Sequence, residues 1–240
     1  MKLSSYFLYL AFLFSLATFA QNTEADSLRI SELNRPDRKY LEDQLFFNFT
    51  YIALKNLYPE VAQQGFSHSF SFGYIRDIPV NLRRNIGFGV GIGYERSIYY
   101  QNLKIDVDQN TGKITYEILD PQTYRINAFG IKQIIFPVEF RFRGSTSDKF
   151  KFWRLYAGMT FGYVLTAFSS FENEYISIKI RNLNAIPSKY QYGIHLYAGY
   201  AELNAYIYFG LNDLFSPEVK VDGKHVPMQD IRFGFMLTFL

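Results

Sequence analysis

The residues of this 240-residue chain that could do chemistry are charged side chains and histidines placed within apolar, strand-like segments. Glu139, Arg141 and Arg143 alternate with phenylalanines, so all three share one face of an extended segment. On the inner face of a closed sheet, such residues would form ion pairs with one another. We therefore predict a polar interior network of Glu95, Glu139, Arg141, Arg143, Arg154, His195 and Arg232.

This network has two interpretations. It either fills the interior of a narrow barrel or lines a path for protons or solutes. Structural filling is the main interpretation, because a barrel of eight strands leaves little open bore. We also expect Glu139 and Arg154 to be near neighbours across a short turn at 144–152.

The sequence gives little support for catalysis. His68, His195 and His225 fall on an outward strand position, in the interior and in the last loop, so no Ser–His–Asp cluster is evident. Cysteine is absent, which excludes thiol catalysis and disulfides. With 25 Lys and Arg against 22 Asp and Glu, a net charge of +3 does not favour nucleic acid as a partner. We expect a protein that is not an enzyme.

Two motifs resemble ligand sites, but strands and turns explain both. One loop has the spacing of an EF-hand calcium site, although Thr111 stands where that pattern requires glycine and both flanks alternate like strands. Its oxygen-bearing residues are Asp106, Asp108, Asn110 and Glu117. The run GFGVGIG at 87–93 has a strict spacing of two, so its glycines share one strand face and do not cradle a phosphate. We expect neither a metal nor a cofactor, and calcium remains the alternative to a plain hairpin turn.

The N-terminus predicts export. Lys2, an apolar run at 6–16 and small residues before Gln21 form a signal peptide over residues 1–20. Residues 21–42 are polar, carry both signs of charge and are interrupted by Pro36, which predicts a periplasmic extension. The remaining residues, 43–240, are expected to form one barrel domain.

Period-2 alternation through that domain predicts an all-β protein. It recurs in eight segments, at about 43–54, 66–74, 85–97, 127–143, 153–167, 192–200, 204–211 and 230–240. No apolar stretch after residue 21 reaches the roughly 20 residues of a transmembrane helix. We therefore predict an antiparallel up-and-down transmembrane β-barrel of about eight strands in the Gram-negative outer membrane.

The connections alternate in length. Long ones lie at 55–65, 98–126, 168–190 and 213–229, and short ones at 77–84, 144–152 and 200–203. Outer-membrane barrels have short periplasmic turns and long extracellular loops, so both termini are expected to be periplasmic. In strand four, Pro137 cannot donate to a ladder and predicts a bulge or local break.

Outward aromatic residues then fall at both ends of the strands and predict two interfacial girdles. The extracellular girdle comprises Tyr51, Tyr94, Tyr163 and Tyr192, and the periplasmic girdle Tyr74, Trp153 and Tyr200. The competing interpretation is the aromatic core of a soluble barrel. It would crowd every large side chain into an interior barely wide enough for side chains.

The last strand carries a pattern that resembles the signal read by the barrel-insertion machinery. Its key residues are Arg232, Gly234, Leu237 and Phe239. The expected partners are that machinery, periplasmic chaperones, and the lipids and lipopolysaccharide of the outer membrane.

The mature chain resembles the PorT-like family of outer-membrane β-barrel proteins from Bacteroidota. The segments that carry the resemblance are GFGVGIGYE, QIIFPVEFRFR, RLYAGMTFGYVL, YGIHLYAGY and YIYFGLNDLF. The resemblance implies a barrel and, since some members are associated with type IX secretion and gliding motility, secretion-system proteins as partners. It transfers no functional residue.

Three functions are therefore weighed. The first is a non-enzymatic barrel whose exposed loops, especially 98–126 and 168–190, contact a partner protein or a surface glycan. The second is a narrow porin-like channel. The third is a lipid-modifying enzyme, which the small number of histidines disfavours.

Overall fold

A computed structural model describes residues 43–81, 84–108, 113–144 and 152–239. The expected signal peptide (1–20) and periplasmic extension (21–42) lie outside the described residues, as do most of the turn at 144–152 and Asn110 and Thr111 of the calcium-like loop. Within the described part of the chain, no helix is long and apolar enough to cross a membrane.

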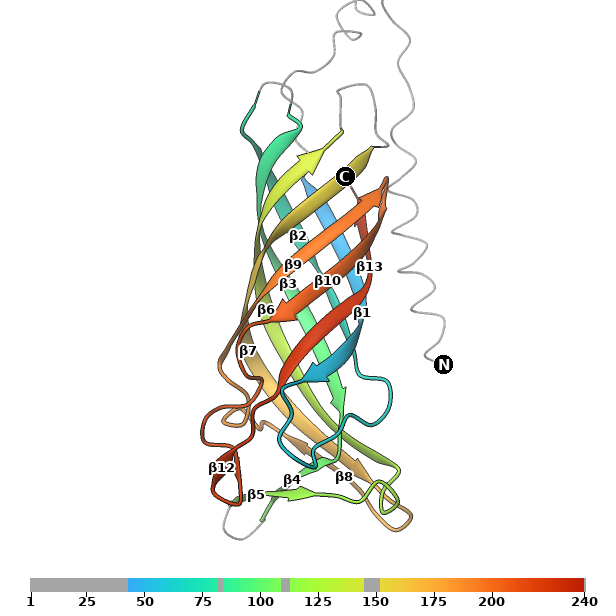
Figure 1. Cartoon of the computed structure of the whole chain (residues 1–240), viewed down its shortest axis with the longest axis vertical. Coiled ribbons are helices and arrows are strands. Elements are labelled where there is room, and N and C mark those ends of the chain that lie inside the picture. The colour runs from blue at the N-terminus through green and yellow to red at the C-terminus, as the bar shows by residue number, and fades with distance from the viewer. Residues whose placement is uncertain (1–42, 82–83, 109–112, 145–151, 240) are drawn as a thin grey trace, which may run out of the picture. The chain divides into compact units, whose positions relative to one another are not determined.

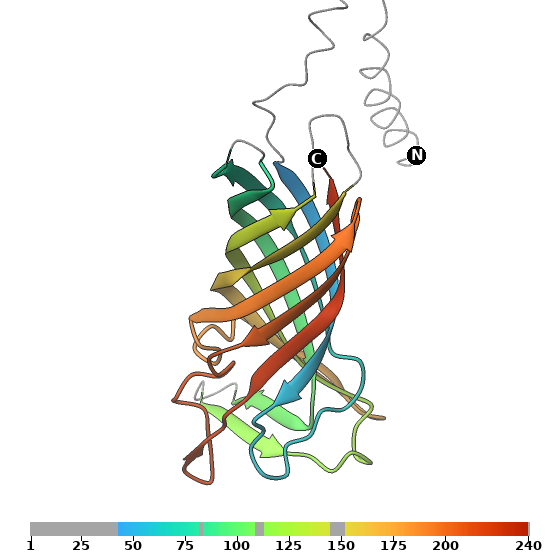
Figure 2. The same cartoon turned by 45° about the horizontal axis from the view of Figure 1, so that its top comes forward.

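Eight long strands form a closed wall (Figures 1 and 2). Each pairs antiparallel with the next long strand along the chain, and the last pairs with the first. The predicted eight-stranded, antiparallel, up-and-down barrel is therefore confirmed. The strands are β1 (Gln44–Lys55), β2 (His68–Pro79), β3 (Ile86–Tyr100), β6 (Ile126–Arg143), β7 (Trp153–Glu172), β9 (Tyr190–Tyr200), β10 (Leu203–Gly210) and β13 (Gln229–Phe239).

The shorter strands lie at the end of the barrel that carries the long connections, which is the lower end in Figure 1. β4 (Leu103–Val107) and β5 (Ile114–Ile118) form one hairpin, and β11 (Lys220–Val221) and β12 (Lys224–His225) form another. β8 (Ser177–Arg181) pairs with the far part of β7, which runs five residues beyond its predicted end at 167. The long connections are thus folded structures.

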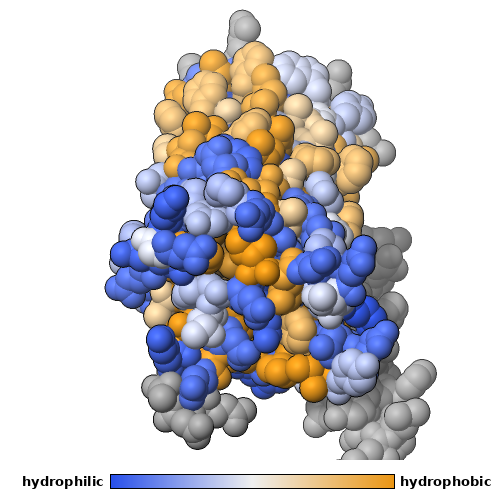
Figure 3. Space-filling model, turned by 60° about the horizontal axis from the view of Figure 1, so that its bottom comes forward, coloured by the Kyte–Doolittle hydropathy of each residue, from blue (hydrophilic) through white to orange (hydrophobic). Residues whose placement is uncertain are grey.

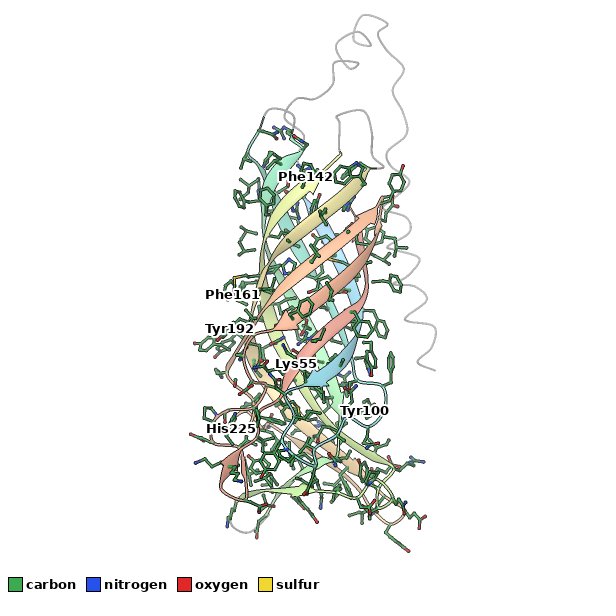
Figure 4. The ribbon with its side chains drawn as sticks, in the orientation of Figure 1. Lys55, Tyr100, Phe142, Phe161, Tyr192 and His225 are labelled. Carbon is green, nitrogen blue, oxygen red and sulfur yellow. The ribbon has the colours of Figure 1, made fainter. Side chains whose placement is uncertain are left out.

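The alternation of side chains sets the two faces of the wall. In β1, Phe47 and Phe49 are 43% and 50% exposed, whereas Asn48 and Thr50 are buried. Other strands repeat this arrangement, and Phe142, Phe161 and Tyr192 point away from the barrel (Figure 4). Hydrophilic residues gather instead over the long-loop end (Figure 3). A wall that is apolar outside and polar inside is the pattern of a barrel in lipid.

Apolar side chains from the long connections pack over the barrel mouth. We call this group the apolar cap; its loop residues include Leu103, Ile105, Leu183, Ile186, Leu214, Phe215, Val219 and Val226. They pack against wall residues such as Tyr99, Phe129 and Ile131, with the rings of Phe129 and Phe215 centred 5.2 Å apart. The cap closes the long-loop end of the barrel.

Pro137 interrupts the ladder on one side only. The β3–β6 pairing stops after Val90 and Val138 and resumes at Gly93 and Ile135 in the same register. The register shift of β6 lies elsewhere, between Lys132 and Gln133, on the side that faces β7. The predicted local break is present at the proline, while the bulge lies four to five residues before it, where Leu165 of β7 has no partner in the ladder.

Candidate functional site

Charged side chains in the barrel interior form two groups. The Glu139 cluster (Asp77, Glu139, Arg141 and Arg143) lies toward the short-turn end. Arg141 Nε donates to Glu139 Oε1 at 2.8 Å, and Arg141 Nη1 to Asp77 Oδ1 at 3.0 Å. The Tyr197 hydroxyl donates a hydrogen bond of 2.7 Å to Glu139 Oε1. All four charged side chains are buried and paired, as buried charges must be.

The Glu95 cluster (Glu95, Asp230 and Arg232) lies nearer the cap. Arg232 Nε donates to Asp230 Oδ2 at 2.7 Å, and Arg232 Nη1 pairs with Glu95. Gln133 donates to Glu95 Oε1 at 2.7 Å. The guanidinium of Arg232 lies 4.8 Å from the centre of the Tyr208 ring. The charged groups of both clusters are paired, whereas Gln133 Oε1 beside Glu95 has no hydrogen-bond partner among the described residues.

His195 lies between a hydroxyl and a carboxylate. Its Nδ1 is 2.9 Å from Thr160 Oγ1, and its Nε2 is 3.3 Å from Glu139 Oε2. This is the order of groups in a hydroxyl–imidazole–carboxylate triad. The space beside these groups is only about 20 Å³, room for about one water molecule. An organic substrate has no room there, so we interpret the arrangement as part of the filling.

The seven residues of the predicted interior network all lie inside the wall and are at most 6% exposed. One expected contact is wrong: Glu139 is opposite Gly158, whereas Arg154 is opposite Arg143, four residues along the ladder. Arg154 instead hydrogen-bonds Thr238 and covers the Phe152 ring at 4.7 Å. The turn length suggested proximity, but the register separates the two side chains.

Two interior carboxylates were missed from the sequence. Asp77 lies in the segment predicted as the turn at 77–84, yet β2 continues to Pro79. Asp230 is the second residue of the last strand, β13. Alternation along the strand could have identified both. Asp77 is two residues from inward-facing Ile75, and Asp230 is two residues from inward-facing Arg232, so each lies on the inner face.

The residues expected in the two girdles lie on the outer face. Tyr163 and Tyr192 are 37% and 40% exposed, and Tyr51 and Tyr94 are half-buried, all toward the long loops. At the other end, Trp153 pairs with Tyr200 across β7 and β9, and both are exposed. Tyr74, 37% exposed, hydrogen-bonds Asp43.

The last strand, β13, closes the barrel between β10 and β1. Of the residues expected in the assembly signal, Arg232 points inward, and Leu237 and Phe239 point outward at 41% and 45% exposure. A Cβ on Gly234 would lie 2.1 Å from the carbonyl oxygen of Phe49, so this position also has a packing role. Recognition by the insertion machinery stays a prediction.

An open groove of about 720 Å³ lies on the long-loop surface, between residues 122–125 and 172–175. Arg125 pairs with Glu172 across it, and Tyr175 is 88% exposed. The Tyr124 hydroxyl has no hydrogen-bond partner among the described residues. Burial, helped by the Asp120 carboxylate, raises the pKa of the Tyr124 phenol. The groove therefore offers aromatic and polar groups to a partner.

The calcium-like loop is built on the β4–β5 hairpin. Asp106 lies opposite Thr115, and Lys104 pairs with Asp106 at 3.0 Å. Among the residues that the structure describes, no three His, Asp or Glu side chains gather in a way that could hold a metal ion. The strand flanks of the loop were predicted correctly.

Comparison with known proteins gives a family. The model of the family described as "Outer membrane protein beta-barrel domain" matches residues 19–216. No curated protein matches the chain significantly in sequence. Among solved structures, the chain is similar to Ail, the attachment invasion locus protein of Yersinia pestis, at 10% sequence identity and a TM-score of 0.30. The match covers 82% of this chain and 97% of that chain, and it is too weak to inform function.

Proposed function

The chain belongs to the outer membrane protein beta-barrel domain family, and from this premise we propose that it is a non-enzymatic barrel that binds a partner through its long loops. The outer membrane is its location. The partner is a protein or a surface glycan, and it meets the loops on the extracellular side.

The observation that carries this proposal is the closed interior. The Glu139 and Glu95 clusters fill the barrel, and about 20 Å³ remains beside His195. The apolar cap covers the long-loop end of the barrel. Because the interior is filled, a ligand would bind on the exposed surface of the loops. Loops on a rigid scaffold commonly carry binding residues.

The groove at 122–125 and 172–175 supports the same conclusion. Its residues include Tyr124, Tyr175, Gln122 and Asn173, which combine aromatic area with adaptable hydrogen bonding. Binding loops in other proteins are enriched in such residues, because tyrosine gives a large contact area at a low entropic cost. Tyr175, which is 88% exposed, is the aromatic side chain most available to a partner.

Site-specific photo-cross-linking in intact outer membranes tests the proposal. A cross-linker replaces Tyr175, which is 88% exposed among the long loops, or Val80, which is 55% exposed at the short-turn end. We expect a discrete adduct from position 175 that is absent at position 80. Equal adducts at both positions, or none at 175, would overturn the proposal.

The finer assignment concerns the partner. We propose that the partner is a component of type IX secretion; this rests on the resemblance of segments such as GFGVGIGYE to the PorT-like family. Identification of the position-175 adduct as a secretion protein would support it. Recovery of only the insertion machinery and abundant porins would leave a free-standing barrel. Intact lipid A after incubation with the purified protein would argue against the lipid-modifying alternative.

A further inference from the structure

Four cationic side chains gather on the outer wall of the barrel near its long-loop end. Arg96 comes from β3, Lys132 from β6, and Lys179 and Arg181 from β8. Lys132 is half-buried and the other three are exposed. Together with Thr166 and Phe168 they line an open pocket of about 420 Å³. We call this group the basic wall patch.

The strand register holds the patch together. Arg96 lies opposite Lys132, and Lys132 lies opposite Thr166, so these three form a row across β3, β6 and β7. Arg181 lies opposite Phe168 on the other side of β7. Figure 1 shows β8 beside the lower part of the barrel, where this pairing extends the wall. The short strand β8 thus brings two further cations to a row that the barrel already contains.

The Phe168 ring is the floor of the patch. A Cβ on Gly130 would lie 2.2 Å from this ring, so the glycine is what lets the phenylalanine lie flat on the wall. The guanidinium of Arg96 is 5.5 Å and the ammonium of Lys179 is 5.4 Å from the ring centre. Such contacts orient the two cations without neutralising them. Phe168 itself is 8% exposed because the cations cover it.

The positive charge of the patch is not neutralised by acidic side chains of the described residues. Among the described residues, none of the four cations forms an ion pair. Four like charges on one face repel one another, so an anionic ligand that bridges them gains free energy. The mixture of guanidinium and ammonium groups with a hydroxyl suits phosphate oxygens.

The position of the patch identifies the source of the anion. Arg96 follows Tyr94 of the extracellular girdle by two residues on the same face of β3, and Thr166 adjoins outward, 41% exposed Leu165. The patch therefore begins where the apolar belt ends, at the level of lipid headgroups. We propose that it binds the phosphate groups of a lipopolysaccharide molecule in the outer leaflet. This inference uses the membrane location and does not depend on the loop partner.

The test compares two double variants of the full-length protein in neutral detergent micelles. Lys132→Gln/Lys179→Gln removes two charges from the patch. Lys220→Gln/Lys224→Gln removes two exposed charges from the β11–β12 hairpin. The probe is fluorescent lipopolysaccharide, used intact and after enzymatic removal of its lipid A phosphates. Unchanged heat-modifiable mobility in gels confirms that both variants are folded.

We expect the patch variant to bind intact lipopolysaccharide about thirtyfold more weakly than wild type, because it lacks two basic residues and each one near a membrane surface contributes about 1 kcal/mol. The control variant should bind like wild type, and the dephosphorylated probe should lose most of its affinity. Equal affinity of the two variants, or equal affinity for the two probes, would overturn the proposal. Full displacement by an equimolar amount of inorganic phosphate would show a free-anion site, and the lipid assignment would be wrong.

Discussion

Arg143 and Asp77 face each other through two parallel hydrogen bonds of 2.7 Å, and neither side chain is exposed to solvent. Arg143 belongs to β6 and Asp77 to β2, so the contact spans the intervening strand β3. It can do so because the inner face of β3 carries Gly87 and Gly89 at this level. The glycine stripe is thus the floor over which the Glu139 cluster is built.

Asp77→Asn should destabilise the barrel strongly. The substitution keeps the side-chain shape but leaves Arg141 and Arg143 without the carboxylate that both contact. Breaking a buried ion pair by removing one partner costs about 3–5 kcal/mol. Urea unfolding in micelles measures the free energy of unfolding. Arg76→Gln, an exposed neighbour, is the control and should change it little. A midpoint for Asp77→Asn like that of wild type would contradict the described cluster.

Gly89→Val should disrupt the same cluster from the other side. A Cβ at this position would lie 2.6 Å from Arg141 Nε and 2.8 Å from Glu139 Cγ. Overpacking of this kind costs about 1–3 kcal/mol. The matched control is Val90→Leu, which changes an outward side chain that is 47% exposed. Thermal unfolding should separate the two variants, and equal stability would show that the interior has room to spare.

Phe239→Ala should slow assembly without a matching loss of stability. Phe239 and Phe235 share the outer face of β13 and are 45% and 63% exposed, but only Phe239 belongs to the predicted assembly signal. We expect slower insertion by purified insertion machinery for Phe239→Ala than for Phe235→Ala. Spontaneous folding into detergent should be alike for the two. Equal insertion rates for the two variants would show that Phe239 is not part of an assembly signal.

Trp153 should lie at the membrane interface. It is the chain's single tryptophan, it is 47% exposed on the outer face, and it lies opposite Tyr200. Its fluorescence in vesicles should be quenched more by lipids labelled near the headgroup than by lipids labelled near the bilayer centre. Stronger quenching by lipids labelled near the bilayer centre would contradict the prediction that the periplasmic girdle lies at the membrane interface.

Much of the wall could be predicted from the sequence, because a period of two assigns each residue of a membrane strand to lipid or interior. Phe47 and Asn48 illustrate this. The network was found in the same way, through the alternation of Glu139 and Arg141 with phenylalanines. The contacts within the network were harder to predict, because the partners of Arg143 depend on the strand register and on a carboxylate two strands away.

The apolar cap could not be predicted. Leu103, Ile105 and Phe215 lie in segments that the sequence indicates only as long connections. Their packing depends on long-range contacts between loops, which leave no local period. β8 was missed for a related reason: it pairs with the part of β7 that continues past the eight-stranded wall.

The most direct test of the central claim is conductance of the purified full-length protein in planar bilayers. A barrel filled by the Glu139 and Glu95 clusters and closed by the apolar cap should give no unitary current steps, and Arg141→Gln or Arg154→Gln should not create an ion-selective current. Reproducible steps in the wild-type protein, with a size or selectivity that changes on neutralising Arg141, would contradict the account and make the narrow channel the function.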